Sequence, residues 1–376
     1  MPAATPQHRP LRIIGLMSGT SMDGVDAAFV ETDGQSHVVL GGHASTPFGD
    51  TFRTRLKAFV AAVPERGAAS DEHAIEIALT DLHVEAVERL LVATKMRRDQ
   101  IDLIGFHGQT IWHRPHQGAT WQMGDARRLA DATGITVVSD FRSADVAAGG
   151  QGAPLVPVFH AALARDIERP LAVVNIGGVA NVTWIGGDDT LVAFDTGTGN
   201  ALIDDWVSKH AGQPMDLDGR IAASGRVHED IVTSMLAHRY FDQPPPKSLD
   251  RHDFTLAPVA LLSTPDGAAT LTAFTAAAIA RGLEHCPAKP KRLLVTGGGR
   301  HNPTLMAEIS RYAGLKAESV DAQGWQGDAV EAQAFAYLAA RTVRGLPISF
   351  PGTTGIAAPL AGGVVTPPQQ QKAAIA

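Results

Sequence analysis

Two stretches of the chain share one pattern of apolar and small residues. Residues 11–17 form an apolar run with strand character, residues 18–24 are small and polar, and a second strand-like run begins at Val25. This pattern predicts a β-hairpin. The pattern recurs over residues 171–185, as an apolar strand, a glycine turn and a returning strand. The two copies lie about one domain length apart, so the sequence predicts two hairpin-led α/β halves that face each other across a cleft.

Four further strand-like runs end in polar or glycine-rich turns. They cover residues 101–106, 135–139, 191–194 and 292–296. The carboxyl ends of strands are where α/β sheets bind ligands, so these turns are candidate site segments. The Gly/Ala-rich residues 144–157 indicate a domain crossing, and lining of a cleft is the alternative. We therefore expect an N-terminal domain over residues 1–140 and a C-terminal domain over residues 141–376.

Charge and composition narrow the classes of partner. The 376 residues include 32 Lys and Arg against 39 Asp and Glu, a net charge of −7. This balance predicts neither a nucleic-acid partner nor binding to an acidic membrane surface. The single cysteine, Cys286, excludes an intrachain disulfide and a multi-cysteine zinc site. No stretch approaches ~18 uninterrupted apolar residues, and we expect a soluble, cytoplasmic protein.

The first hairpin has an unusual tip. It contains Ser18, Gly19, Thr20, Ser21 and Gly24, which offer hydroxyls and unshielded backbone N–H groups with almost no bulk. Consecutive N–H groups in a turn can bind a phosphate. The nearby carboxylates Asp23 and Asp26 would repel a bare phosphate, so in that interpretation one of them acts through Mg²⁺. The alternative is an ordinary Gly/Ser-rich turn.

Two acidic residues occupy positions that fit either chemistry or helix capping. Asp195 ends a strand and precedes Gly197, Gly199 and a helix, where it could be a general base, a metal ligand or a turn residue. Glu331 opens the last long helix, over residues 329–343, at capping-box spacing from Asp328. Both interpretations of each residue stay open on this evidence.

The other polar segments have weaker signals. Gly297, Gly298 and Gly299 lie between a strand and a helix and would let an adenine or ribose lie flat on backbone, although the sequence is neither a Walker A motif nor GxGxxG. Residues 215–253 are polar and predict a surface excursion or lid. Lys247 within them could contact an anionic substrate group, but a position in solvent is favoured. Because His107, His113 and His116 have no acidic or thiol partner at ligand spacing, hydrogen bonding or packing is favoured over zinc.

Several of these motifs together resemble one family. They are Gly15-Leu-Met-Ser-Gly-Thr-Ser-Met-Asp-Gly-Val-Asp26, His107-Gly-Gln-Thr110, Asp140-Phe-Arg142, Ala147-Ala-Gly-Gly-Gln-Gly-Ala-Pro-Leu-Val-Pro157, Asn175-Ile-Gly-Gly178, Asp195-Thr-Gly-Thr-Gly-Asn200, Pro246-Lys-Ser248 and Gly297-Gly-Gly299. Their order and content closely resemble the anhydro-N-acetylmuramic acid kinases. The resemblance implies an α/β fold of two similar actin/hexokinase-like (ASKHA) domains around an interdomain cleft.

The resemblance also implies a reaction. Such a kinase opens the 1,6-anhydro ring of 1,6-anhydro-N-acetylmuramic acid by adding water at C1 and transfers the γ-phosphate of ATP to O6, in recycling of cell-wall sugars. By resemblance Asp195 is the base that activates water and Glu331 lies in the same sugar site. Asp140 is a competitor for the base, because other kinases of this fold carry theirs at a comparable point.

Nucleotide contacts follow from the same resemblance. They are assigned to Gly19, Thr20, Ser21, Met22, Asp23, Gly24, Val25 and Asp26 at the phosphates, with Gly197 and Gly199, and to Gly297, Gly298 and Gly299 beside the adenosine. Asp23 is the candidate ligand of Mg²⁺, and the family suggests a homodimer. Two departures from the family pattern are Thr198 before Gly199, where proline is usual, and Leu249 after Ser248.

Two other functions remain alternatives at this point. An ordinary hexose or amino-sugar kinase would use its base on a substrate hydroxyl instead of water. A nucleotide switch of the actin or Hsp70 kind would hydrolyse ATP slowly and show no sugar-dependent release of ADP.

Overall fold

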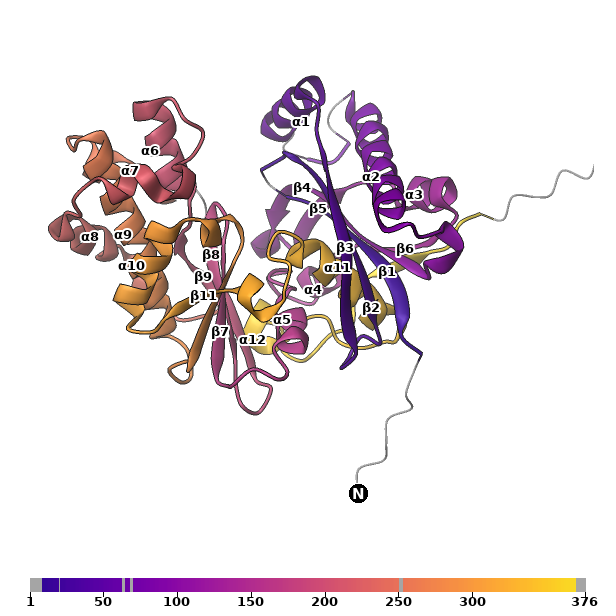
Figure 1. Ribbon diagram of the computed structural model, residues 1–376. Coiled ribbons are helices and arrows are strands. Elements are labelled where there is room, and N and C mark those ends of the chain that lie inside the picture. Colours follow the sequence, from indigo (N-terminus) through magenta and orange to yellow (C-terminus); the bar gives the residue numbers. More distant parts are fainter. Residues whose placement is uncertain (1–8, 20, 63–64, 68–69, 250–252, 370–376) are drawn as a thin grey trace, which may run out of the picture. The chain divides into compact units, whose positions relative to one another are not determined.

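The chain divides into two compact units in the computed structural model (Figure 1), which describes residues 9–19, 21–62, 65–67, 70–249 and 253–369. The first unit consists of the described residues of Met1–Ala162 and Ala329–Ala376, and the second is Leu163–Asp328. The chain thus leaves the first unit later than the expected boundary at residue 140, and its last part returns to that unit. The second unit is inserted into the first.

The first unit is built on a mixed sheet with the strand order β12-β6-β4-β1-β2-β3, in which β5 also pairs with β4. Its strands are β1 Leu11–Ser18, β2 Gly24–Thr32, β3 Val38–Pro47, β4 Leu103–Arg114, β5 Ala119–Met123, β6 Thr136–Ser139 and β12 Val364–Thr366. Its helices are α1 Asp50–Ala62, α2 Glu72–Thr94, α3 Ala126–Thr133, α4 Ser143–Ala147, α5 Pro157–Leu163 at the boundary, α11 Val330–Val343 and α12 Pro351–Thr354.

The second unit is built on a five-stranded sheet with the order β11-β10-β7-β8-β9. Its strands are β7 Leu171–Ile176, β8 Val179–Ile185, β9 Leu191–Thr198, β10 Arg292–Thr296 and β11 Ala317–Ser319. Its helices are α6 Ala201–Ala211, α7 Arg220–Ala223, α8 Glu229–Leu236, α9 Thr264–Leu283 and α10 Pro303–Ala313.

The two sheets repeat one topology. In the first, β1, β2 and β3 pair in antiparallel fashion and β4 and β6 continue in parallel from β1. In the second, β7, β8 and β9 pair in antiparallel fashion and β10 and β11 continue in parallel from β7. The prediction of two similar hairpin-led α/β halves is therefore confirmed. The cleft expected between them stays a prediction.

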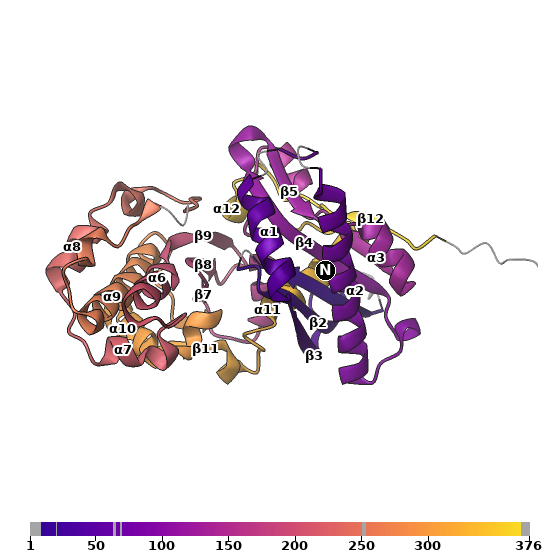
Figure 2. The ribbon, with the colours of Figure 1, turned by 90° about the horizontal axis from the view of Figure 1, so that it is seen from above.

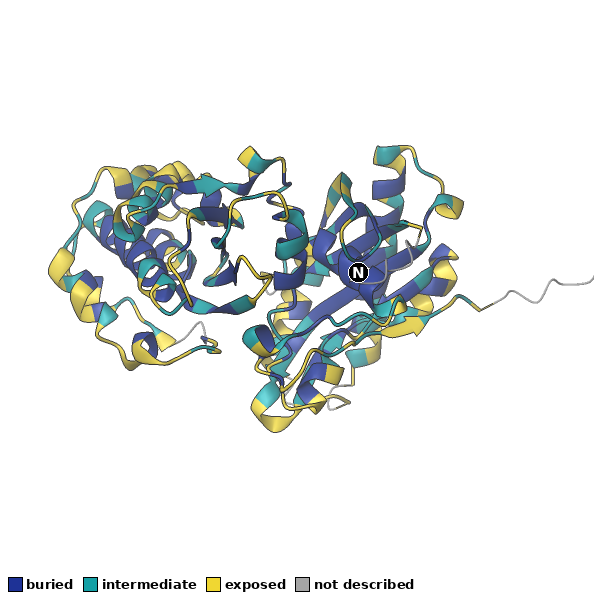
Figure 3. Ribbon diagram, turned by 90° about the horizontal axis from the view of Figure 1, so that it is seen from below, coloured by how far each residue is buried: buried dark blue, intermediate teal, exposed yellow. Residues whose placement is uncertain are grey.

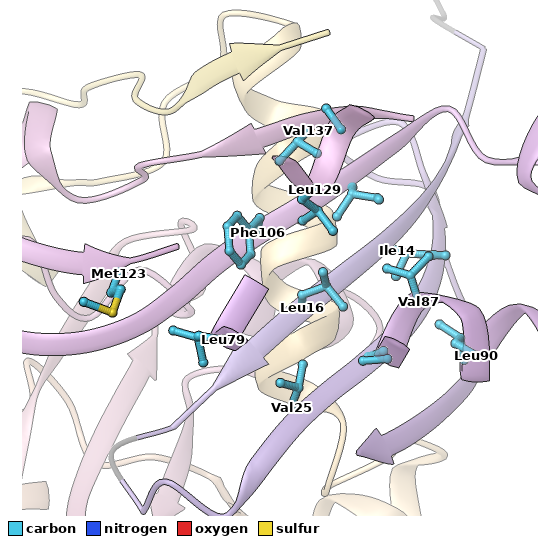
Figure 4. Packing of buried hydrophobic residues seen from close by; sticks show 14 of the residues in the cluster. Ile14, Leu16, Val25, Leu79, Val87, Leu90, Phe106, Met123, Leu129 and Val137 are labelled. Carbon is cyan, nitrogen blue, oxygen red and sulfur yellow. The ribbon is translucent and has the colours of Figure 1, made fainter. Parts of the chain in front are cut away.

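Alternation along the strands of the first sheet sends side chains to two different helical layers. Ile14 and Leu16 of β1 pack with Phe106 of β4 against Leu79 and Val87 of α2 (Figure 4). Figure 3 shows that buried residues concentrate in the strands and inner helices of each unit and exposed residues at their edges.

The opposite face of the first sheet is covered by α11. Two glycines make this contact possible, because a Cβ on Gly15 would lie 1.8 Å from the carbonyl oxygen of Ala332 and one on Gly105 would lie 2.1 Å from that of Phe335. Backbone of the strand and backbone of the helix therefore lie in direct contact. This packing explains why the last part of the chain belongs to the first unit.

The Gly/Ala-rich residues 144–157 do not leave the first unit directly. Part of this segment is α4, and the carboxylate of Asp145 accepts hydrogen bonds from the Gly152 N–H (2.6 Å) and the Thr354 hydroxyl (2.6 Å). The segment is thereby attached to α12. The predicted domain crossing at these residues occurs instead after them.

In the second unit, α6 to α10 gather on one side of the sheet (Figure 2). Residues 215–253 contribute to this layer through α7 and α8, and their described part places Val232, Met235 and Phe241 in apolar clusters with α9. The described part of this segment is therefore a helical layer that packs on α9 and not an irregular excursion. A role as a lid stays a prediction.

Candidate functional site

Asp195 lies within β9, opposite Asn181 of β8. Its backbone N–H donates to the carbonyl of Lys247 (3.0 Å), and its carboxylate Oδ2 accepts from the Leu249 N–H (2.9 Å). The Tyr240 hydroxyl donates to the Asp195 carbonyl (2.5 Å). Segments far along the chain thus fix both the backbone and one carboxylate oxygen of Asp195.

The protonation equilibrium of Asp195 differs from that of an ordinary aspartate. Burial raises its pKa from 3.8 to about 6, and the hydrogen bond from Leu249 opposes this in part. A carboxyl with a pKa close to neutral is both ionised at pH 7 and able to hold a proton, as a general base requires. Asp195 caps no helix, because α6 begins at Ala201 with Asn200 at its N-cap. The capping alternative for Asp195 was wrong.

Lys247 is not in solvent as predicted. Its ammonium group donates to the carbonyls of Tyr240 (3.1 Å) and Phe241 (3.4 Å) and lies 4.7 Å from the centroid of the Tyr240 ring. Burial lowers the pKa of Lys247. Lys247 therefore holds the loop that donates the Leu249 N–H to Asp195.

Gly197 and Gly199 are required by packing within the second unit. A Cβ on Gly199 would lie 2.2 Å from the carbonyl oxygen of Gly177, and one on Gly197 would lie 2.8 Å from the Ala278 Cβ. The Gly199 N–H also donates to the carbonyl of Gly178 (2.9 Å). These contacts hold the turn after β9 against the β7–β8 turn. Nucleotide contacts of Gly197 and Gly199 stay a prediction.

The three glycines after β10 differ from one another. A Cβ on Gly297, whose φ is +75°, would lie 2.4 Å from Asn175 Oδ1, and one on Gly299 would lie 2.5 Å from Ile176. Gly298 is exposed, and a Cβ there would meet nothing within 4 Å. Of these three, Gly298 is the one whose surface is open to a ligand.

A cavity of about 170 Å³ lies beside Gly298. Its lining comes from α6, the loop before α7 and the segment between β10 and α10, through Asn200, Ile203, Asp204, Met215, Asp216, Leu217, Asp218, Gly298, His301 and Asn302. Asp216 is committed to structure, because its two oxygens accept from the N–H groups of Ile221 (2.8 Å) and Ala222 (2.9 Å). The mixed apolar and acidic lining suits a flat base carrying a hydroxylated sugar.

The hairpin tip in the first unit is held by a neighbouring strand. The side chain of Gln109, on β4, accepts from the Ser18 hydroxyl (2.5 Å) and donates to the Gly19 carbonyl (3.1 Å). Sequence reasoning missed this role, for which the signal was a glutamine at the end of a buried strand. Within the tip, the Met22 N–H donates to the Gly19 carbonyl (3.1 Å). Thr20 lies outside the described residues.

Asp23 lies exposed at the tip, while Gly24, Val25 and Asp26 begin β2. The Ser21 hydroxyl donates to Asp23 Oδ1 (2.8 Å). Exposed carboxylate oxygen is the kind of ligand that Mg²⁺ prefers. The assignment of Asp23 as a ligand of Mg²⁺ stays a prediction.

Glu331 and Asp140 both belong to the first unit. Glu331 is exposed in the first turn of α11, and Asp140 is exposed after β6 with a φ of +53° and accepts from the Ser143 hydroxyl (2.5 Å). The capping box predicted for Asp328 and Glu331 was wrong. The N-cap of α11 is Ala329, and Asp328 instead pairs with Arg300 (2.8 Å).

The predicted histidine roles are in part confirmed. His107 and His113 both make hydrogen bonds, and His113 bridges the Thr120 hydroxyl (2.8 Å) and the Gln151 carbonyl (2.7 Å). Within the described ranges, no three His, Cys, Asp or Glu side chains are grouped so that they could hold a metal ion. None of the helices in those ranges is long and apolar enough to cross a membrane.

The chain is similar to proteins of one family over nearly its whole length. A family model described as anhydro-N-acetylmuramic acid kinase matches residues 11–368. A relative of that name from Rhizorhabdus wittichii is 54% identical, and the matched region covers 94% of this chain and 98% of the relative. Another from Paramagnetospirillum magneticum is 51% identical, and the match covers 93% of this chain and 98% of that relative.

Solved structures are more distant. Component A of (R)-2-hydroxyglutaryl-CoA dehydratase from Acidaminococcus fermentans has a TM-score of 0.46 at 14% identity, covering 88% of this chain and 99% of that one. A ROK family glucokinase from Streptomyces griseus has a TM-score of 0.40 at 11% identity, covering 87% and 98%. The family assignment depends on the sequence matches, which show that the chain belongs to the anhydro-N-acetylmuramic acid kinase family.

Proposed function

We propose that the chain uses ATP to phosphorylate O6 of 1,6-anhydro-N-acetylmuramic acid while water adds at C1, giving N-acetylmuramic acid 6-phosphate. Membership of the kinase family supports the substrate and the phosphate donor. The observation that carries the mechanism is the partly buried carboxyl of Asp195, which accepts from the Leu249 N–H and whose pKa burial raises to about 6. Ordinary kinases need a base for a substrate hydroxyl, whereas this substrate has no free hydroxyl at O6.

In the proposed reaction the ionised carboxylate of Asp195 takes a proton from water as its oxygen bonds to C1. The C1–O6 bond breaks, and its electron pair stays on O6. O6 then bonds to the γ-phosphorus of ATP, and the bond from that phosphorus to the β-γ bridging oxygen breaks to release ADP. No separate acid is needed for O6, because phosphorus takes the place of a proton. The proton held by Asp195 leaves to solvent after turnover.

Two segments described above are proposed for the nucleotide. The cavity beside Gly298 suits the adenosine, and the hairpin tip held by Gln109 suits the phosphates. Asp23 would hold Mg²⁺, which supplies charge neutralisation for the phosphates when it is bound. The family resemblance also extends the proposal to a homodimer in the cytoplasm. Light scattering of the eluted protein is the direct test of the dimer.

The test uses ¹⁸O-labelled water, MgATP and 1,6-anhydro-N-acetylmuramic acid, with mass spectrometry of the product. We expect label at C1 of a 6-phosphorylated sugar, lost in Asp195→Asn and retained in the matched variant Asp140→Asn. Unlabelled phosphorylated product would mean ordinary kinase chemistry. If the label were lost in Asp140→Asn and kept in Asp195→Asn, Asp140 would be the base. If the wild type released no ADP in response to the sugar, the protein would not be this enzyme.

A second test addresses the adenosine cavity. In Gly298→Val the added side chain enters open space, whereas in Gly299→Val it meets Ile176 at 2.5 Å. We expect Gly298→Val to raise KM for ATP with little change in melting temperature and Gly299→Val to lower the melting temperature. An unchanged KM for ATP in Gly298→Val would place the adenosine elsewhere.

A further inference from the structure

His107 and Arg142 form a buried pair in the first unit. His107 lies on β4 and is 4% exposed. Its Nδ1 is 2.7 Å from the carbonyl oxygen of Gly108, which can only accept, so Nδ1 carries the ring proton. The lone pair of Nε2 then accepts from Arg142 Nε (3.1 Å) and Nη2 (2.9 Å). One neutral tautomer satisfies all three contacts.

The imidazole ring is fixed by packing as well as by hydrogen bonds. Its centroid lies 4.4 Å from that of Phe335 on α11, and Phe335 also packs against Phe141, beside Arg142 (5.4 Å between centroids). Burial, followed by the charge of Arg142, lowers the pKa of His107 well below 6.5. His107 is therefore a neutral acceptor in ordinary buffers, and His83 and His113 are its other ionisable neighbours.

Arg142 is held on a second side as well. Its Nη1 donates to the carbonyl of Gly152 (2.7 Å). Burial lowers the pKa of Arg142 to about 10, and the charges of Glu331 and Asp145 oppose this, so the guanidinium stays protonated. Asp145 already accepts from the Gly152 N–H and the Thr354 hydroxyl. Glu331, the second acidic neighbour, is exposed at the start of α11.

We propose that His107 is a positioning residue for the sugar site, because it fixes the guanidinium of Arg142 in the unit that also carries Glu331. The proposal rests on the proposed function and on the family resemblance that assigns Glu331 to the sugar site. An arginine side chain is long and loses much rotamer freedom when it binds a ligand. Holding it in place before binding removes that cost from the affinity for the sugar. This assigns a role to the first residue of the His107-Gly-Gln-Thr110 motif.

Two amide variants separate the contacts of the ring. In His107→Gln the amide oxygen can reach the position of Nε2 and accept from Arg142. In His107→Asn the amide nitrogen can reach the position of Nδ1 and donate to Gly108, but no acceptor remains for Arg142. Both variants lose the ring, so they share any loss of packing on Phe335.

We expect His107→Asn to raise KM for the sugar about tenfold or more, since a hydrogen bond to a charged group is lost, with KM for ATP within about twofold. His107→Gln should recover most of the sugar affinity. Arg142→Lys keeps the charge but not the planar fork, so adding His107→Asn to it should cost little more. Equal effects of the two amides, a parallel rise in KM for ATP or additive effects with Arg142→Lys would overturn the proposal.

Nitrogen NMR of the selectively ¹⁵N-labelled His107 ring tests the pair without turnover. We expect a proton on Nδ1 alone from about pH 5.5 to 8, with a change in the Nε2 signal in Arg142→Lys. A proton on Nε2, or titration near the ordinary histidine value, would overturn the pairing even in an active enzyme. If the wild type shows no sugar-dependent release of ADP, the proposed function and the role of Arg142 towards the sugar are overturned. The NMR measurement still tests the pairing of His107 with Arg142 in that case.

Discussion

Replacing Asp195 with asparagine should stabilise the protein while it abolishes activity. Asparagine can still accept from the Leu249 N–H, but it carries no charge to bury. The pKa of Asp195 rises from 3.8 to about 6 in the folded protein. At ~1.4 kcal/mol per pH unit, this difference corresponds to about 3 kcal/mol of unfolding free energy, as an upper bound.

The sign follows from proton binding. Between the two pKa values the folded protein binds this proton more tightly than the unfolded chain, so the unfolding free energy of the wild type falls as pH rises through the window from 3.8 to about 6. The cost of the buried charge is small near pH 4 and complete above the folded pKa. Integration over the window makes the gain in Asp195→Asn about 2 kcal/mol larger at pH 8 than at pH 4.5.

The assay is thermal unfolding of the wild type and Asp195→Asn at pH 4.5 and pH 8. The quantity measured is the melting temperature of the second unit, separately from that of the first. For a unit of this size, about 3 kcal/mol corresponds to roughly 6–12 °C at pH 8. The transition of the first unit is the internal control and should not move. Equal gains at the two pH values, or none at pH 8, would refute the argument that Asp195 is buried as a charged group at neutral pH.

Three further predictions concern other parts of the two units. The value of kcat/KM should fall as pH drops through about 6, because the base Asp195 becomes protonated, and a profile that stays flat to pH 5 would contradict this. Gln109→Ala should raise KM for ATP about tenfold through loss of its two bonds to the hairpin tip, with KM for the sugar as the control measurement. Gly105→Val should lower the melting temperature of the first unit, because the added Cβ would lie 2.1 Å from the Phe335 carbonyl oxygen. In the control Gly49→Ala the Cβ meets nothing within 4 Å, so the melting temperature should not change. Calorimetry of the two variants measures both effects.

The sequence predicted the local elements of the fold well, because they depend on neighbouring residues. The apolar runs of β1 and β7 with their small turns identified both hairpins. The position of Gly298 after a strand followed from the same local signals, whereas β9 continues past Asp195 to Thr198 and does not end at residue 194 as expected. These signals also placed Asp195 next to a helix, but they could not distinguish a buried carboxyl from a capping one.

Contacts between distant segments were not predictable from local pattern. A glycine within a strand indicates that another segment approaches closely. The sequence around Gly15 and Gly105 does not show that this segment is α11. Similarly, Asp328 has capping-box spacing, yet its pairing with Arg300 competes for the same carboxylate. The burial of Lys247 against Tyr240 depends on how residues 239–247 fold back on β9.

The return of α11 to the first sheet has a consequence for synthesis of the chain on the ribosome. The sheet strands β1 to β6 emerge before the second unit, but the face that carries Gly15 and Gly105 is covered only after α11 has emerged. The inserted second unit can therefore complete its core first. Until α11 emerges, one face of the nascent first sheet stays uncovered. A chaperone that recognises apolar strands would bind at this stage of translation.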